Sequence, residues 1–172
     1  MRERTVKIGS AGKMFGLTWW KVGFLCAAPE LTHTLARAHQ FLTFTTPPNL
    51  QAAVAWGLEN SGDWFQTMPR DLERSRDRLS DGLKREGFAV LTSQGTYFLN
   101  IDLTASGIAE PDRDFALRAV KEAGVAAIPV SAFYEADAVT SILRLCFSKR
   151  DETLDAGIER LARARELSQA AR

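Results

Sequence analysis

Apolar and polar positions along the chain follow two periods, which predict a mixed α/β fold rich in helices. Short apolar stretches that stop at glycine or turn residues predict strands at 5–8, 21–27, 88–91, 97–103, 125–130 and 142–147. Apolar residues at helical spacing predict helices that begin at Pro29, Pro48, Asp63, Asp112 and Asp151. Stretch 21–27 is almost continuously apolar, so we expect that strand to be buried on both faces.

The stretch 63–86 has a pattern of its own. Its charges alternate in sign, and Leu72, Leu79 and Leu83 recur at helical spacing. This pattern predicts one long, mostly solvated helix of the kind that links two domains, with Gly87 as its end. The two strands that follow it flank the turn 92–95 and predict a hairpin.

Composition and charge narrow the classes of function. The chain has 172 residues, 45% of them hydrophobic, which is enough for a folded product with a core. Lysine and arginine number 22 against 21 acidic residues, so the net charge of +1 gives no long-range attraction for nucleic acid or an anionic membrane. No apolar run approaches the roughly 20 residues of a membrane span. Cys26 and Cys146 lack CxxC spacing and are expected to be reduced core thiols of a cytoplasmic protein.

The candidate chemistry lies in the stretch 9–21, where Lys13 stands alone among small residues and Lys21 follows. A nucleotide P-loop is excluded, because it needs four residues between its glycines and a hydroxyl residue after the lysine. Here two residues separate Gly9 from Gly12, and Met14 follows Lys13. Two alternatives remain: a surface lysine in a glycine-rich turn, and a lysine that forms a Schiff base with pyridoxal phosphate.

The second alternative is supported by a longer pattern, Ser-x-Gly-Lys-x-Phe-(Gly/Ser)-x-Thr-Gly-Trp-Lys-x-Gly. It is matched by Ser10, Gly12, Lys13, Phe15, Gly16, Thr18, Trp20, Lys21 and Gly23. Further matches are His39-Gln40, Pro47, 51–53, 95–98, 127–134 and Arg144 within LRLCFSKRDETL. In these residues, and over essentially its whole length, the chain resembles the fold-type I, class I/II aminotransferases. It looks most like the kynurenine, glutamine and methionine aminotransferase branch.

The resemblance implies a fold, an activity and partners. The fold is the C-terminal portion of the fold-type I pyridoxal-phosphate transferase, with 1–64 a remnant of the large cofactor-binding domain. Residues 65–172 are then the small C-terminal domain together with the long interdomain helix. The implied activity is transfer of an amino group between an L-amino acid and a 2-oxo acid, in an enzyme that forms a homodimer. Neither nucleic acid nor a membrane is an expected partner.

The resemblance also implies roles for individual residues. Lys13 holds the aldehyde of pyridoxal phosphate and afterwards, as a free amine, carries the proton of the substrate α-carbon. We expect such an amine in a buried neighbourhood. Ser10 and Lys21 contact the cofactor phosphate, one through its hydroxyl and one through its charge. Lys21 is a point charge and lacks the two-point fork that an arginine there offers.

Arg144 lies on an apolar predicted strand, where an unpaired guanidinium is costly. Its partner is either an internal Asp or Glu, or the α-carboxylate of an amino-acid substrate. The family resemblance favours the carboxylate, because a two-point contact there aligns the α-carbon for proton removal.

Other candidates carry weaker signals. Phe44 either shapes the substrate side-chain pocket near a dimer partner or belongs to the core. Tyr97 and Phe98 are interpreted as hairpin packing. His33 and His39 have no ligand-type residues at metal spacing, so no metal site is expected.

The chain departs from the family in two ways. The family's N-terminal part supplies an aspartate for the pyridine nitrogen and further cofactor contacts, and no residue here matches them. We therefore expect poor activity from this chain alone, and the alternative is a truncated, inactive remnant that acts at most as a folded or partner-binding module. The strands at 5–8 and 21–27 are then expected to lack sheet neighbours and to expose apolar surface.

Trp19 is the second departure, because the family usually has glycine at that position. An indole there is expected to strain the turn or obstruct it, and so to impair cofactor seating.

Overall fold

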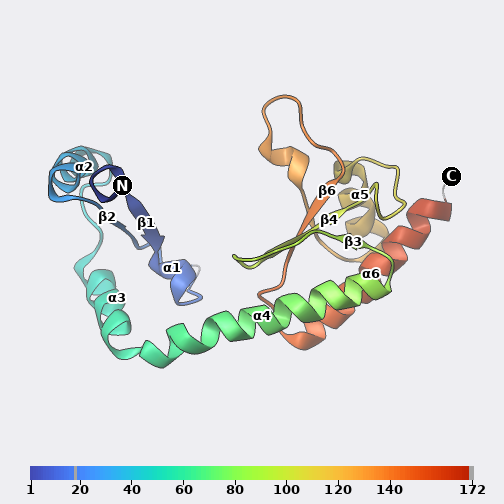
Figure 1. Ribbon diagram of the computed structural model, residues 1–172, viewed down its shortest axis with the longest axis horizontal. Helices are drawn as coiled ribbons and strands as arrows, with labels where there is room; N and C mark the ends of the chain where they lie inside the picture. Colours follow the sequence, from blue (N-terminus) through green and yellow to red (C-terminus); the bar gives the residue numbers. More distant parts are fainter. Residues whose placement is uncertain (18, 171–172) are drawn as a thin grey trace. The chain divides into compact units, whose positions relative to one another are not determined.

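The computed structural model describes residues 1–17 and 19–170, so Thr18 of the lysine motif lies outside the described residues. The chain divides into two compact units, Met1–Phe65 and Gln66–Arg172. The first unit contains the 3-10 turn Arg2–Arg4, β1 (Lys7–Ser10), α1 (Ala11–Met14), β2 (Gly23–Cys26), α2 (Pro29–Leu42) and α3 (Pro48–Asn60). The helix α4 (Gly62–Arg85) begins in this unit and continues into the second. Figure 1 labels β1, α1, β2, α2, α3 and α4.

The second unit is built on a four-stranded antiparallel sheet in the order β3-β4-β6-β5. Its strands are β3 (Ala89–Val90), β4 (Phe98–Asp102), β5 (Ile128–Pro129) and β6 (Ile142–Cys146). Its other elements are α5 (Asp112–Arg118), the π-helical turn η2 (Ala119–Ala123), the 3-10 turn η3 (Val130–Phe133) and α6 (Asp151–Ala170). The helix-rich mixed α/β fold expected from the sequence is confirmed.

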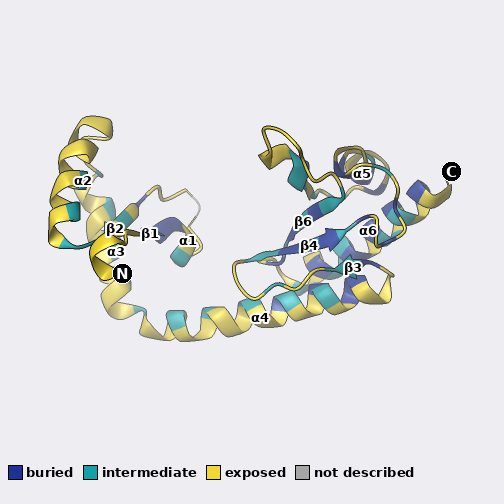
Figure 2. Ribbon diagram, turned by 45° about the horizontal axis from the view of Figure 1, so that its top comes forward, coloured by how far each residue is buried: buried dark blue, intermediate teal, exposed yellow. Residues whose placement is uncertain are grey.

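Alternation along the strands divides the sheet of the second unit into two faces. Leu99, Ile101, Leu143 and Leu145 are buried and belong to one core cluster with residues of α4, α5 and α6. Phe98, Asn100 and Arg144 point to the opposite face and are half-buried. Figure 2 shows the buried residues of this unit on the strands and on the inner faces of the helices.

Helices α4 and α6 lie side by side in the second unit (Figure 1) and are joined by ion pairs. Arg74 pairs with Asp151 at 2.8 Å, and Arg78 pairs with Asp155 at 2.6 Å. The hydrogen bond from Arg78 holds the pKa of Asp155 below its ordinary value. Among residues 1–17 and 19–170, no helix is both long and apolar enough to cross a membrane.

The predicted helices are all present, and the long one runs from Gly62 to Arg85 with Gly87 after it at φ +80°. The hairpin is confirmed by the pairing of Ala89 with Asp102 and of Val90 with Ile101. The strand predicted at 125–130 is wrong in extent, because only Ile128–Pro129 pairs. Pro129 has no N–H to donate, and the N–H of Ser131 donates to the Asp112 carboxylate instead of to a strand.

The expectation that strand 21–27 is buried on both faces is wrong. In β2, Phe24 is half-buried and Gly23, Leu25 and Cys26 are exposed. Among the described residues β2 pairs with β1 alone, in a sheet of two strands, and its unit has little core to cover the faces, since Ala11 and Val22 are its buried hydrophobic residues. The expectation that the strands at 5–8 and 21–27 lack sheet neighbours is wrong, because β1 and β2 pair with each other. The exposed apolar surface expected with it is found at Leu25 and Ile8, with 38% and 80% of their surfaces accessible. Cys26 is consequently no core thiol, while Cys146 is half-buried, and both are free.

Candidate functional site

The β1–β2 hairpin brings the two ends of the lysine motif together. Its register sets Ser10 opposite Gly23, and the Ala11 N–H donates to the Val22 carbonyl at 2.9 Å. Helix α1 begins immediately after Ser10, so Lys13 lies one turn beyond the strand. Lys21 comes just before the paired part of β2 and therefore lies at the same end of the hairpin as Ser10.

Gly12 is required by the close approach of the following loop. A Cβ atom at this position would lie 2.5 Å from the Trp20 carbonyl oxygen and 2.8 Å from that of Leu17. Both obstacles are backbone atoms, which cannot swing aside as a side chain does. The loop is itself closed by a hydrogen bond from the Trp20 N–H to the Leu17 carbonyl at 3.0 Å. A residue with no side chain thus lets the loop pack on the helical turn that carries Lys13.

The other end of α1 is fixed by aromatic side chains. The ring of Phe15 lies against Gly57 of α3, and its centroid is 5.3 Å from that of Phe65 in an edge-to-face arrangement. The indole N–H of Trp64 donates to the Met14 carbonyl at 2.8 Å. These contacts hold the lysine-bearing turn on the helices of the first unit.

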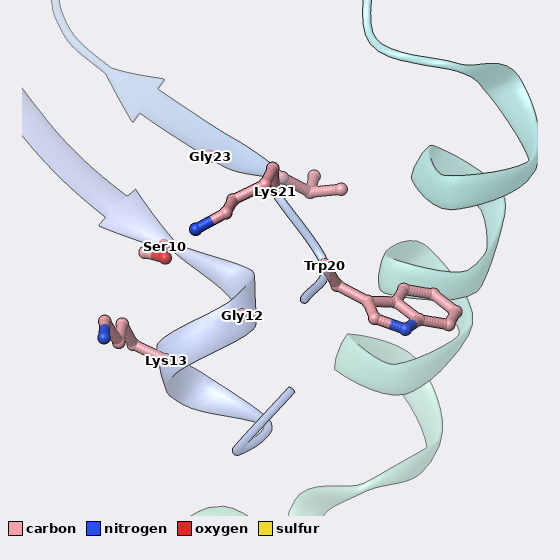
Figure 3. A pocket seen from close by; sticks show the side chains of 7 residues that line it. Ser10, Gly12, Lys13, Trp20, Lys21 and Gly23 are labelled. Carbon is pink, nitrogen blue, oxygen red and sulfur yellow. The ribbon is translucent and has the colours of Figure 1, made fainter. Parts of the chain in front are cut away.

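A pocket of about 270 Å³ opens at this turn, shown in Figure 3. Its lining is formed by Ser10, Gly12, Lys13, Trp20, Lys21, Val22 and Gly23. The side chains of Ser10 and Lys21 point to the same side of the turn, and the indole of Trp20 points away from them (Figure 3). A hydroxyl and two ammonium groups at one pocket suit a ligand that bears a phosphate.

Two expectations for this pocket are corrected. Lys13 was expected in a buried neighbourhood, and its residue is exposed because the first unit has few covering elements. Trp19 was expected to obstruct the turn. Its residue is 91% exposed and does not belong to the pocket lining, so the indole does not obstruct the pocket. Strain in the turn and impaired cofactor seating, the other parts of that expectation, stay predictions.

Arg144 stands in the middle of β6 in the second unit. Its guanidinium carbon lies 4.1 Å from the ring centroid of Phe98 and 4.6 Å from that of Phe133, so the charge is stacked against two aromatic rings. No carboxylate in the part of the chain that the structure describes forms an ion pair with it, and its Nε atom is buried without a hydrogen-bond partner. The internal ion pair considered as an alternative is thus not found among these residues.

A buried carboxylate holds one of those two rings in place. Asp112, at the start of α5, is fully buried and accepts hydrogen bonds from the backbone N–H and the hydroxyl of Ser131, both at 2.8 Å. Ser131 belongs to η3, the same 3-10 turn that carries Phe133. Asp112 therefore fixes the turn that stacks Phe133 on Arg144.

The sequence indicated Asp112 only as the start of a helix and Phe133 only as part of the matched stretch 127–134. It assigned neither residue a role beside Arg144, and it interpreted Phe98 as hairpin packing. Phe98 does contact Tyr97, at 4.4 Å between ring centroids, but it also lies under the guanidinium. Phe44 is 78% exposed with φ +62°, so its alternative as a core residue is wrong. The structure thus brings Ser10, Lys13 and Lys21 together in one unit, and builds a separate setting for Arg144 in the other.

Comparisons with known proteins identify relatives over most of the chain. A family model described as aminotransferase class I and II matches residues 2–161. Curated relatives include a probable N-succinyldiaminopimelate aminotransferase of Mycobacterium tuberculosis, 40% identical over 94% of this chain and 43% of the relative. The methionine aminotransferase of Escherichia coli is 35% identical, with 94% of this chain and 42% of the relative covered. Human kynurenine–oxoglutarate transaminase 1 is also 35% identical, over 94% of this chain and 43% of the relative.

Solved structures give the same picture. The N-succinyldiaminopimelate aminotransferase from Mycobacterium tuberculosis matches with a TM-score of 0.88 and 41% identity, over 95% of this chain and 43% of that one. YbdL from Escherichia coli, identified as a methionine aminotransferase, matches with a TM-score of 0.88 and 35% identity over 94% and 42%. The chain therefore spans less than half the length of the relatives it matches.

Proposed function

Because this chain belongs to the class I and II aminotransferases, we propose that it carries the reactive lysine and the carboxylate-binding arginine of an aminotransferase. The observation that carries the proposal is the pocket at which Ser10, Lys13 and Lys21 meet. Members of this family are generally dependent on pyridoxal phosphate, whose binding requires a primary amine for the aldehyde and donors for the phosphate. The pocket lining provides both.

In this proposal the first unit holds the cofactor. The Lys13 amine would condense with its aldehyde carbon and release water, and the Ser10 hydroxyl and the Lys21 ammonium group would donate to its phosphate. The bound cofactor supplies an electron sink for negative charge at the substrate α-carbon. Lys13, free as an amine once the amino acid has displaced it, would take the proton from that carbon and deliver it to the former aldehyde carbon of the cofactor, and would carry a proton in the opposite direction in the second half of the exchange.

The second unit binds the substrate. The guanidinium of Arg144, held between Phe98 and Phe133, donates two parallel hydrogen bonds to the α-carboxylate and orients the amino acid. The three relatives named above are called aminotransferases of N-succinyldiaminopimelate, methionine and kynurenine. We accordingly assign an L-amino acid and a 2-oxo acid as the substrates. Met1–Phe65 is assigned to the large cofactor-binding domain and Gln66–Arg172 to the small domain.

The exposed Phe44 supports a homodimer in which this ring borders the partner's substrate pocket.

The pocket at Lys13 lacks one contact that the cofactor requires. None of the seven residues that line this pocket is acidic, so the lining has no partner for the pyridine nitrogen. That gap supports the alternative function, a folded module that binds a partner but does not catalyse.

Transfer of the amino group separates the two functions. We would mix the chain with pyridoxal phosphate and L-methionine and measure the conversion of the cofactor to pyridoxamine phosphate by chromatography. The wild-type chain is expected to convert it at least about tenfold faster than Lys13→Ala, because the positioned amine moves the proton. Lys7→Ala, which removes an exposed lysine of β1, is the matched control and should retain the wild-type rate. Equal rates for wild type and Lys13→Ala would favour the non-catalytic module.

A further inference from the structure

Asn100 and Arg144 face each other across two neighbouring strands. They are register partners in the antiparallel pair of β4 and β6, and both are half-buried on the sheet face opposite to the core. Antiparallel partners alternate between pairs that exchange backbone hydrogen bonds and pairs whose side chains lie closer together. The backbone bonds from Phe147 to Tyr97 and from Leu103 to Ser141 mark two pairs of the first kind. Asn100 and Arg144 therefore form a pair of the second kind, which exchanges no backbone hydrogen bonds. The side chains of such a pair lie closer together than those of a hydrogen-bonded pair.

The side chains also hold complementary atoms that have no partner. The Nε atom of Arg144 and the Oδ1 atom of Asn100 are both buried, and neither makes a hydrogen bond. The first is a donor and the second an acceptor. Buried polar atoms are seldom left unpaired, because each has lost its hydrogen bonds to water. A single hydrogen bond between these two neighbouring side chains would therefore give a partner to both the donor and the acceptor.

The stacking of Arg144 fixes one feature of its guanidinium group and leaves another undetermined. The rings of Phe98 and Phe133 restrict the plane of the guanidinium. An aromatic face gives no preferred direction within that plane, so the aim of the two terminal nitrogens is not fixed by stacking. A hydrogen bond at Nε would fix it, because the guanidinium nitrogens form a rigid fork.

The neighbouring acid on the same strand face is already engaged. Asp102, two residues from Asn100, accepts a hydrogen bond from the Ala105 N–H at 3.0 Å through its Oδ1 atom. Its strand partner is Ile142 and not Arg144. Asn100 is thus the residue with an unpaired side-chain acceptor that lies opposite Arg144 in the strand register.

We propose that Asn100 is a positioning residue for Arg144, whose Nε–H donates to the Asn100 Oδ1 atom when a carboxylate binds. The proposal rests on the carboxylate-binding role of Arg144 in the proposed function. The inner nitrogen is then held by the strand β4, and both terminal nitrogens remain for the carboxylate. Asn100 thereby strengthens binding of the carboxylate without contacting it.

The test uses the ¹⁵N-labelled full chain and the monocarboxylate 3-phenylpropionate as the probe. The Nε–H signal of Arg144 is assigned by its loss in Arg144→Lys. On adding the probe to the wild-type chain, we expect this signal to shift and its exchange with water to slow. In Asn100→Leu the exchange should stay fast with probe present, and the dissociation constant should rise roughly threefold to tenfold for one lost hydrogen bond.

A second variant tests the same contact in case Asn100→Leu does not fold. In Asn100→Asp the new carboxylate keeps the size of the side chain and pairs with Arg144, so the Nε–H should be protected before any probe is added. Probe affinity should fall at the same time, because that carboxylate competes with the probe. Asn60→Leu makes the matched change at an asparagine that bonds to Trp56, and should behave as wild type.

The outcomes distinguish this inference from the proposed function. If Arg144→Lys loses the probe while Asn100→Leu matches the wild type in both affinity and Nε–H exchange, the positioning role is overturned and the role of Arg144 stands. If Arg144→Lys binds the probe as the wild type does, or the wild-type signal does not respond at the highest soluble probe concentration, both roles are overturned.

Discussion

At the scale of single residues, Gly12 decides where Lys13 lies. Its backbone is covered so closely by the carbonyls of Leu17 and Trp20 that a Cβ atom has no room. The loop between α1 and β2 can therefore pack on the lysine-bearing turn only when this position is glycine. The loop leads directly into Lys21. The absence of a Cβ atom at Gly12 therefore helps to set how far the Lys21 amine lies from the Lys13 amine.

We predict that Gly12→Ala displaces this loop and weakens pyridoxal phosphate binding at least about tenfold, because overlap with backbone atoms forces a shift of the chain. The measurement is the dissociation constant of pyridoxal phosphate, followed by its absorbance. Gly95→Ala is the matched control, since a Cβ atom there meets nothing within 4 Å. Identical constants for the two variants would contradict the account of Gly12.

The residues of the lysine pocket were predictable from the sequence, and those around Arg144 were not. Ser10, Lys13 and Lys21 lie within twelve positions of one another, so a local motif contains them. Phe133 and Asn100 meet Arg144 only because β4, β6 and η3 come together in the folded chain. A single sequence carries no signal for which strands pair, and so Phe98 was interpreted as hairpin packing alone.

At the scale of elements, the turn η3 depends on one buried carboxylate. Asp112 accepts two hydrogen bonds from Ser131, and its own N–H donates to the Thr140 carbonyl at 2.7 Å. The start of α5, the turn η3 and the segment before β6 are thereby tied together. Phe133 reaches Arg144 from this tied turn.

We predict that Asp112→Asn lowers the free energy of unfolding by about 2 kcal/mol, because an amide leaves one buried Ser131 donor without its acceptor. Urea denaturation followed by circular dichroism measures this loss. Asp114→Asn changes an exposed carboxylate on the same helix and should alter the free energy by less than about 0.5 kcal/mol. Equal effects of the two substitutions would mean that the contacts to Ser131 contribute nothing to stability.

The type of an element was predictable where the hydrophobic pattern was long. The predicted length of an element was wrong where side chains compete with strand pairing for backbone hydrogen bonds. The helix 62–85 has three leucines in register with its period, and it formed as expected. The strand at 125–130 was cut short by Pro129 and by the bond from Ser131 to Asp112, a partner 19 residues away. The predicted burial of β2 was wrong for another reason. Apolar residues show that a strand can be buried, but they do not show whether the fold places other elements over it.

At the scale of the whole molecule, burial is distributed unequally between the two units. Among the described residues, Ala11 and Val22 are the buried hydrophobic residues of Met1–Phe65, and all others lie in Gln66–Arg172 (Figure 2). The lysine pocket thus stands on the unit with little core of its own. In the proposed function, cofactor binding would consequently depend on the local turn, its glycine and the aromatic contacts around Phe15.

The most direct test of the central claim is to map where pyridoxal phosphate attaches. The chain is incubated with increasing pyridoxal phosphate, reduced with borohydride to make the attachment permanent, and digested for mass spectrometry of every lysine. We predict that Lys13 is modified at the lowest concentration of all lysines, and that Ser10→Ala and Lys21→Ala each raise that concentration about tenfold by removing a phosphate donor. Modification spread evenly over the lysines, or unchanged at Lys13 in both variants, would contradict the claim that this turn is a cofactor site.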